Sequence, residues 1–125
     1  MKRKISTDKA PAAIGPYSQG IVAGNTLYAS GQIPIAPATG EIKGEDILGQ
    51  AEQVMKNVGA ILTEAGYGYE DVVKTTCFLA DMGDFAAFNG VYEKYFTEKP
   101  ARSTAKNPSM PLSSIISCKS IPFAS

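Results

Sequence analysis

The sequence predicts an α+β sandwich in which two helices cover one face of a β-sheet. Two sets of patterns support this fold class. The β-branched and apolar stretches 21–30 and 72–80 are typical of strands. The amphipathic stretches 45–66 and 84–97 are typical of helices. Because helices grouped on one face leave the other face of the sheet open, we expect that open face to be buried against further copies of the chain.

The first third of the chain is predicted to hold a hairpin between two loops. The basic segment 1–5 is expected to be frayed. Residues 10–19 contain two prolines and a glycine, which indicates an ordered loop. The stretch 21–30 predicts two short strands that turn at Gly24. Residues 31–44 contain two further prolines and are expected to form a second loop.

The middle of the chain predicts helix, strand and helix. In 45–66, apolar residues recur at steps of three and four, and Gly66 is a natural stop. This apolar face consists of Ile47, Leu48, Ala51, Val54, Met55, Val58, Ile61, Leu62 and Ala65. The strand at 72–80 follows. Asp84 is expected to cap a second helix that runs to about Thr97. Its inner side is predicted to be Phe85, Phe88, Val91, Tyr92, Tyr95 and Phe96.

The tail, residues 104–125, differs in composition from the rest of the chain. Its 22 residues include six serines and three prolines, and no acidic residue follows Glu98. Residues 112–121 are nevertheless expected to add a strand, because several of them are isoleucine or leucine. Ile115 and Ile116 are adjacent, so only one of them can face the core, and we expect a weaker element than the other strands.

The composition narrows the classes of function. The 125 residues are expected to form one domain, residues 1–125. A net charge of zero disfavours nucleic-acid binding. No apolar run approaches a membrane span, so we expect no membrane partner, and no signal-peptide core is visible; we therefore expect a cytoplasmic protein. The chain has no histidine and only two cysteines, Cys77 and Cys118, so we expect no metal site and no cofactor. Cys77 is interpreted as a small buried hydrophobe.

Few residues can carry chemistry. Arginine occurs only at Arg3 and Arg102, so a planar grip on a carboxylate must come from Arg102 or from the N-terminus. Arg102 is alternatively a surface residue at the start of a strand. Tyr17, in the first loop, either orients a substrate through its hydroxyl or fills an interface. Ser30 and Gly31 offer a hydroxyl and a backbone N–H to a small anion, or form an ordinary turn.

Four segments carry a family resemblance. They are APAAIGPYSQG at 10–20, SGQIP at 30–34, VKTT at 73–76 and PARS at 100–103. In this order and spacing they resemble the RidA family, also called YjgF, and its YabJ branch, which is described as purine-regulatory. The family has also been labelled translation inhibitor and endoribonuclease.

The resemblance implies a fold, an assembly and an activity. The fold is a chorismate-mutase-like sandwich with a mixed sheet. The assembly is a homotrimer whose sheets form a central barrel, with clefts between the subunits. The activity is the hydrolytic deamination of reactive 2-enamine and 2-imine acids, such as 2-aminoacrylate and 2-iminobutyrate, to 2-keto acids and ammonia. The expected partners are therefore further copies of the chain and small 2-imino or 2-keto carboxylates, and no cofactor is implied.

The resemblance also implies roles for individual residues. Arg102 matches the arginine that pairs with the substrate carboxylate. Tyr17 matches a tyrosine that lines the cleft from a neighbouring subunit. Ser30 and Gly31 match the serine and glycine of the cleft wall.

Three further positions follow from the same resemblance. Asn89 matches an asparagine near the site. Thr104 stands where many members have a cysteine whose backbone N–H contacts the keto or imine group. If Met110 and Pro111 are aligned with the Leu-Pro turn of the family, Ser117 occupies the place of the glutamate that positions the attacking water.

Ser117 leaves two functions open. Without a histidine, a serine hydroxyl cannot act as a base near neutral pH, so water positioning by this residue would be impaired. The first reading is therefore an imine deaminase whose activity is reduced by the altered tail. The alternative is a non-catalytic trimer of the same fold that binds a small carboxylate or a protein partner, as a regulator or chaperone-like factor. A ribonuclease is disfavoured by the missing histidine and the zero net charge.

Overall fold

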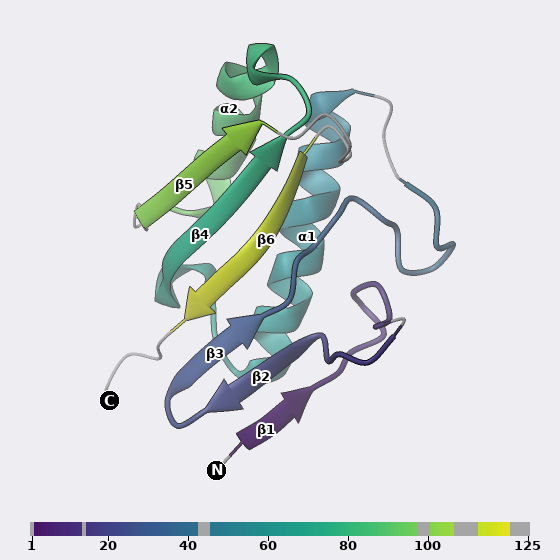
Figure 1. Ribbon diagram of the computed structural model, residues 1–125, viewed down its shortest axis with the longest axis vertical. Helices are drawn as coiled ribbons and strands as arrows, with labels where there is room; N and C mark the ends of the chain where they lie inside the picture. Colours follow the sequence, from purple (N-terminus) through teal and green to yellow (C-terminus); the bar gives the residue numbers. More distant parts are fainter. Residues whose placement is uncertain (1, 14, 43–45, 98–100, 107–112, 121–125) are drawn as a thin grey trace.

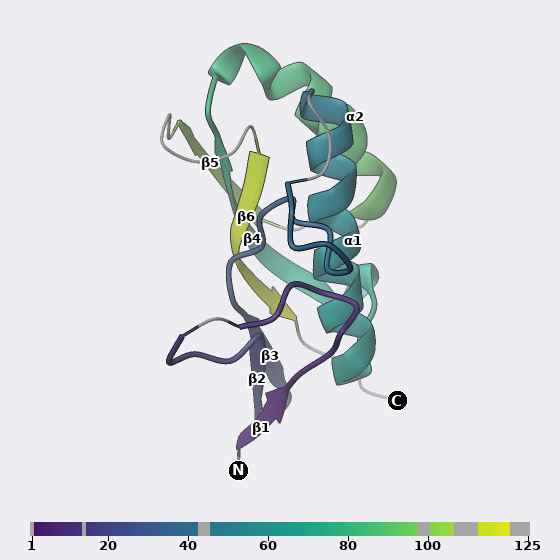
Figure 2. The same ribbon diagram turned by 90° about the vertical axis from the view of Figure 1, so that its right-hand side faces the viewer.

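The computed structural model describes residues 2–13, 15–42, 46–97, 101–106 and 113–120. Six strands form one sheet in the order β1-β2-β3-β6-β4-β5. The strands are β1 (Lys2–Ile5), β2 (Gly20–Ala23), β3 (Thr26–Ala29), β4 (Val72–Leu79), β5 (Ala101–Lys106) and β6 (Ser113–Ser120). The helices are α1 (Ile47–Ala65) and α2 (Phe85–Tyr95). Both helices lie against the same face of the sheet, and the described elements leave the other face uncovered (Figures 1 and 2).

The sheet is mixed, because β4 and β5 pair in parallel whereas every other neighbouring pair is antiparallel. The α+β class with two helices on one face is thus confirmed. The strand predicted at 112–121 is also confirmed, as β6, which lies between β3 and β4 in the middle of the sheet. Its register with β4 shifts between Thr76 and Cys77, so that Ile116 has no partner on β4.

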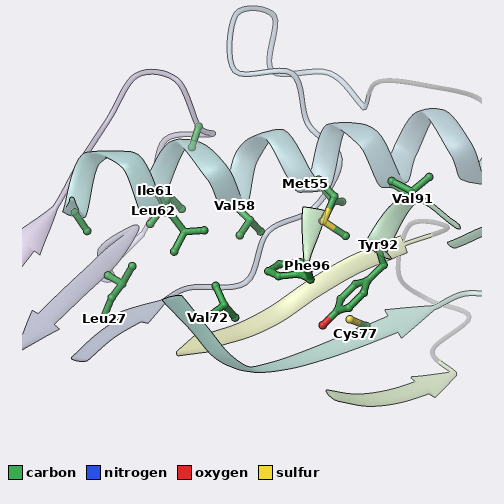
Figure 3. Close-up of a cluster of buried hydrophobic side chains, with 14 of the residues drawn as sticks. Leu27, Met55, Val58, Ile61, Leu62, Val72, Cys77, Val91, Tyr92 and Phe96 are labelled. Atoms are coloured by element: carbon green, nitrogen blue, oxygen red, sulfur yellow. The ribbon is translucent and has the colours of Figure 1, made fainter. Parts of the chain in front are cut away.

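The core lies between the helices and the sheet (Figure 3). In α1 the apolar stripe is buried as predicted, and it packs toward Leu27 of β3 and Val72 of β4. Asp46 caps the helix by accepting a hydrogen bond from Gly49 N–H at 2.9 Å. Two residues of the predicted face depart from this: Leu48 is 50% exposed and Ile47 is only partly buried.

The second helix begins differently from the prediction. Asp84 stands at the N-cap position, but its side chain makes no capping hydrogen bond. Asp81 instead accepts from Gly83 N–H at 2.8 Å and starts a short 3-10 turn, Met82–Asp84, that leads into α2. Phe85, the first residue of α2, is 37% exposed rather than on the inner side.

The expectation of a frayed N-terminus is wrong. Residues 2–5 form β1, which pairs antiparallel with β2 and buries Ile5 to 2% exposure. Arg3 Nη2 donates to the carbonyl of Ala65 at the end of α1, at 3.4 Å. The three consecutive basic residues break the alternation of apolar and polar residues that indicates a strand, so the sequence did not predict β1. Charged side chains nevertheless suit an edge strand, because they discourage pairing with other chains. No helix in the described part of the chain is long and apolar enough to cross a membrane.

Candidate functional site

Arg102 lies in β5, at the edge of the sheet, directly beside Thr75 of β4. Its guanidinium carbon is 4.6 Å from the centre of the Tyr92 ring and 5.3 Å from that of Phe85. Because both rings belong to α2, the guanidinium lies on the helix-covered side of the sheet. Cation–π contact stabilises this position by about 0.5–1 kcal/mol at a partly exposed site. Among the described side chains, no carboxylate lies within ion-pair distance of Arg102. Its fork of donors is therefore suited to a carboxylate from a ligand.

The Tyr92 ring is fixed by contacts with Thr75 of β4 and with Phe96. Its hydroxyl shares a hydrogen bond of 2.7 Å with Thr75 Oγ1, and both residues are buried. The ring also packs against Phe96, with 4.6 Å between the ring centres. Arg102 thus rests on an aromatic ring that is fixed by the core, which restricts the positions of the guanidinium. Tyr92 was predicted as a core residue; its second role beneath Arg102 was not.

Asn89 and Thr104 lie near Arg102 in the fold. Asn89 follows Phe85 by four positions and precedes Tyr92 by three, so the three residues share one face of α2. Its Oδ1 is buried and has no hydrogen-bond partner among the residues that the structure describes. A buried acceptor of this kind can accept from a ligand N–H or from a water. Thr104 is two residues after Arg102 in β5, so both side chains belong to the same side of the strand.

Cys77, opposite Thr104 in the parallel pair, is fully buried. Burial raises the pKa of its thiol to about 11, so the thiol stays protonated at neutral pH. The thiolate is the nucleophilic form, and Cys77 is therefore unsuited to covalent catalysis. Its interpretation as a small buried hydrophobe is confirmed.

Tyr17, Ser30 and Gly31 line one cavity of about 410 Å³. We call these three residues the loop cluster. Tyr17 is 55% exposed and follows a turn at Gly15, whose φ of 128° favours glycine. Ser30 already uses both of its donors: its hydroxyl donates to the carbonyl of Ser18 at 2.6 Å, and its N–H donates to that of Gln19 at 3.0 Å. Its hydroxyl oxygen can still accept, but the anion-binding donors expected from Ser30 are committed within the chain.

Two buried amides that sequence reasoning missed hold the loops in place. Gln19 donates from Nε2 to the carbonyl of Pro11 at 2.7 Å, and its Oε1 accepts from Thr7 N–H at 2.6 Å. Asn57 of α1 donates to the carbonyls of Ile33 and Ile35 at 2.9 and 3.0 Å. Asn57 is fully buried, and its Oδ1 accepts from the neighbouring Gln53 side chain at 2.9 Å. The signal in the sequence was a polar stripe, Gln50, Gln53 and Asn57, next to the apolar stripe of the predicted helix.

The fold does not bring all the candidate residues together within one chain. Asn89, Arg102 and Thr104, which we call the strand cluster, belong to β5 and α2. The loop cluster lies at the end of β3, and β6 and β4 stand between β3 and β5 (Figure 1). With a strand spacing of about 4.8 Å, β3 and β5 are roughly 14 Å apart. Ser117 lies on the intervening β6, at the register position opposite Thr76.

The described side chains offer no group of three or more His, Cys, Asp or Glu residues that could hold a metal ion. The two clusters contribute a guanidinium, an amide oxygen, hydroxyls and backbone N–H groups.

Comparisons with known proteins find similarity over most of the chain, both in sequence and in structure. The family model described as Endoribonuclease L-PSP matches residues 7–119. A RutC family protein of Pyrococcus horikoshii is 50% identical over 124 residues, which cover 98% of both chains. The 2-iminobutanoate/2-iminopropanoate deaminase of Escherichia coli K12 is 48% identical over 115 residues, which cover 89% of each. The crystal structure of E. coli TdcF with bound serine superposes with a TM-score of 0.89 at 38% identity, covering 97% of this chain and 99% of that one.

Proposed function

Because the chain belongs to the endoribonuclease L-PSP family, which includes RidA and RutC proteins, we propose that it hydrolyses reactive 2-enamine and 2-imine acids to 2-keto acids and ammonia. One observation carries this proposal. Arg102 is stacked on a fixed Tyr92 ring and has no ion pair with a described carboxylate, so it is suited to the carboxylate that these substrates share. The E. coli deaminase relative and the serine bound to TdcF support a small carboxylate as the ligand.

The reaction needs little covalent help from the protein. A protonated imine is already electrophilic at C2. Water adds to C2 and loses one proton, and the nitrogen gains one. The C–N bond then breaks while the new hydroxyl loses its proton and becomes the keto oxygen, which leaves ammonia and a 2-keto acid. Holding the carboxylate on Arg102 and the imine nitrogen near the Asn89 amide oxygen orients C2 toward water.

We also propose that the chain acts as one domain, residues 1–125, within a homotrimer. The loop cluster and the strand cluster are separate in one chain, and the face of the sheet away from the helices is open. A second copy that packs on this face and reaches past the edge strand β5 can bring its Tyr17 to the Arg102 of the first. Sedimentation is then expected to show a species of three times 13.2 kDa. A monomer at micromolar concentration would contradict both the assembly and the shared cleft.

The test of activity is a coupled assay. A threonine or serine dehydratase releases the imine, and keto-acid formation is followed with and without this protein. We expect the protein to accelerate release above the uncatalysed rate. No acceleration by a folded protein at any concentration would refute deamination.

A second function is favoured by one observation. β6 carries serine at position 117, where the family resemblance implies a glutamate. A serine there supplies no base, so a trimer that binds small carboxylates without turnover, as a regulator or chaperone-like factor, is the alternative. Binding of 2-ketobutyrate without acceleration in the coupled assay would favour it.

A further inference from the structure

The charges of the chain are divided unevenly between the sheet and the rest of the fold. The six described strands contain no aspartate or glutamate, so all 12 acidic residues of the chain lie in other segments. Of the 12 lysines and arginines, seven lie in the strands: Lys2, Arg3, Lys4, Lys74, Arg102, Lys106 and Lys119. A chain with a net charge of zero therefore has a strongly basic sheet.

Lys74 lies on the face of the sheet that the helices leave uncovered. Its neighbour Thr75 is buried and hydrogen-bonded to Tyr92 of α2, so Thr75 belongs to the covered face. Because successive residues of a strand alternate between the two faces, Lys74 belongs to the uncovered one. Its ammonium group donates to the hydroxyl of Ser103 in β5 at 2.8 Å. This contact holds the ammonium group between β4 and β5 on the uncovered face.

Lys119 of β6 occupies the register position directly opposite Lys74. In the pairing with β3, Lys119 is opposite Tyr28, which is 47% exposed. Residues that are directly opposite in antiparallel strands share a face of the sheet, with Cα atoms about 4.5–5.5 Å apart. Two lysines are therefore cross-strand neighbours on the uncovered face, and like charges in such a pair are destabilising.

No carboxylate of the described segments compensates the charge of Lys74. The ion pair that those segments contain joins Lys94 to Glu52, between the two helices. After its bond to Ser103, the ammonium group of Lys74 has two further protons to donate. Ser103 Oγ accepts in that bond, so its own proton is available for another acceptor. These donors are suited to negatively charged oxygens from outside the chain.

We propose that Lys74, Lys119 and Ser103 form a binding site for a small, multivalent phosphate-type anion, and that this anion stabilises the association of copies through their uncovered faces. The inference rests on the homotrimer of the proposed function. In a trimer whose sheets form a central barrel, both lysines of each copy face one enclosed space, and their mutual repulsion opposes assembly. A phosphate-type anion presents several charged oxygens at once, and a lysine binds such oxygens as a point charge without a planar match.

Sedimentation over a dilution series tests the effect on assembly. The probe is inorganic pyrophosphate. Sodium chloride at the same ionic strength is the matched control, because chloride screens the repulsion without bridging two ammonium groups. Pyrophosphate is expected to raise the association constant at least about tenfold more than chloride does, since one hydrogen bond between charged groups accounts for about a factor of ten or more.

Variants of Lys119 test the assignment to this pair. Lys119→Glu replaces the like-charged pair with an oppositely charged one, so it is expected to associate without pyrophosphate and to lose the response to it. Lys119→Gln removes one charge without adding another, and it is expected to lose most of the response even if the glutamate variant does not fold. Lys56→Glu makes the same charge change at an exposed position on α1, and it is expected to leave the response within about twofold.

Three results would overturn the inference. The first is equal association in pyrophosphate and in chloride. The second is a folded Lys119→Gln variant that responds as the unaltered chain does. The third is a Lys56→Glu variant that loses the response as completely as Lys119→Glu, since net charge alone would then explain it. A monomer under every condition would contradict the homotrimer as well, whereas an assembled protein that does not accelerate keto-acid release in the dehydratase assay would contradict only the deaminase activity.

Discussion

The loop cluster and the strand cluster are made rigid by different means. Tyr17, Ser30 and Gly31 belong to irregular backbone that the buried amides of Gln19 and Asn57 tie to the body of the protein. Arg102 instead stands on a regular strand. The packed α2 and the hydrogen bond between Tyr92 and Thr75 support it from beneath.

We call the loop cluster and the amides that hold it the loop half, and the strand cluster and its support from α2 the strand half. The difference between them shows which substitutions destabilise each half. The loop half depends on a few hydrogen bonds of Gln19 and Asn57, so the loss of one amide affects several loop residues at once. The strand half depends on many small contacts within the core, so a single change there is spread over many neighbours. Between them lies β6, which carries Ser117 and belongs to neither half.

The largest effect is expected from Ser117→Glu, which adds a carboxylate to the strand between the two clusters. If the resemblance gives the right role to this position, the glutamate positions and activates water, and turnover in the dehydratase assay rises by roughly 10²–10⁴-fold, the usual value of one acid–base group. Ser117→Gln is the matched control, because it has nearly the same shape but no base.

Two outcomes would contradict the role given to Ser117. One is a gain as large for glutamine as for glutamate. The other is no gain for glutamate in a folded protein whose sedimentation is unchanged.

The next largest effect concerns the loop half. Asn57→Ala removes the donors to the carbonyls of Ile33 and Ile35 and the acceptor of Gln53. Because these groups are partly or fully buried, we expect the free energy of unfolding to fall by about 2–4 kcal/mol. Urea unfolding at fixed protein concentration measures this. Lys56→Ala, at the exposed neighbouring position, is the control and is expected to change stability by less than about 0.5 kcal/mol.

The fold was predictable where a pattern is local. The hairpin around Gly24, the helix ending at Gly66 and the strand at 72–80 each follow from alternation, periodicity or a turn residue within one segment. The insertion of β6 between β3 and β4 depends on pairing between distant segments, which no local pattern specifies. β1 was missed because its basic residues resemble a solvated end of the chain.

The site was predictable only in part, for a related reason. Counting arginines was enough to select Arg102, since the chain has so few cations of that shape. The support beneath it was not visible, because Tyr92 has the helical spacing of any core residue. Asn57 could have been found: a polar residue at a position that the helix buries must have a partner, and that partner lies on another segment.

The third prediction tests the strand half directly. Arg102→Lys keeps the charge but loses the planar fork, so we expect the binding of 2-ketobutyrate to weaken by about 1.5–3 kcal/mol, or roughly 10- to 150-fold. Calorimetry measures the affinity. Arg3→Lys changes the other arginine in the same way and is expected to leave affinity unchanged. Equal affinities for the Arg102 variant and the unaltered protein would count decisively against a carboxylate site here.

The smallest effect is expected from a contact between α1 and α2, the two helices that support the loop half and the strand half. Glu52 of α1, the helix that carries Asn57, accepts hydrogen bonds from Lys94 and Tyr95 at the end of α2, the helix that carries Tyr92. The Lys94 bond, and after it the Tyr95 bond, hold the pKa of Glu52 below its ordinary value of 4.5. The same carboxylate raises the pKa of Tyr95 to about 12.

These shifts give the pH dependence a definite sign. A lowered carboxyl pKa in the folded state stabilises the protein above about pH 4.5, and this contribution is lost as the pH falls through the folded-state value. The neutral tyrosine stabilises the protein below its ordinary pKa of 10, and this contribution is lost as the pH rises toward 12. The side chain of Lys94 is 59% exposed, so the ion pair itself contributes only about 0.2–1 kcal/mol.

Tyr95→Phe is therefore expected to remove the alkaline loss of stability between pH 10 and 12 and to leave 2-ketobutyrate affinity at neutral pH within about twofold. Tyr67→Phe is the control. It deletes a hydroxyl that donates to the uncharged carbonyl of Asn25, so the alkaline loss remains. Since the Tyr95 contact joins the two helices without touching either cluster, an affinity that falls together with stability in Tyr95→Phe would mean that the loop half and the strand half are not independent. The two halves would then differ in the contacts that hold them, but a loss of stability in one would still lower ligand affinity in the other.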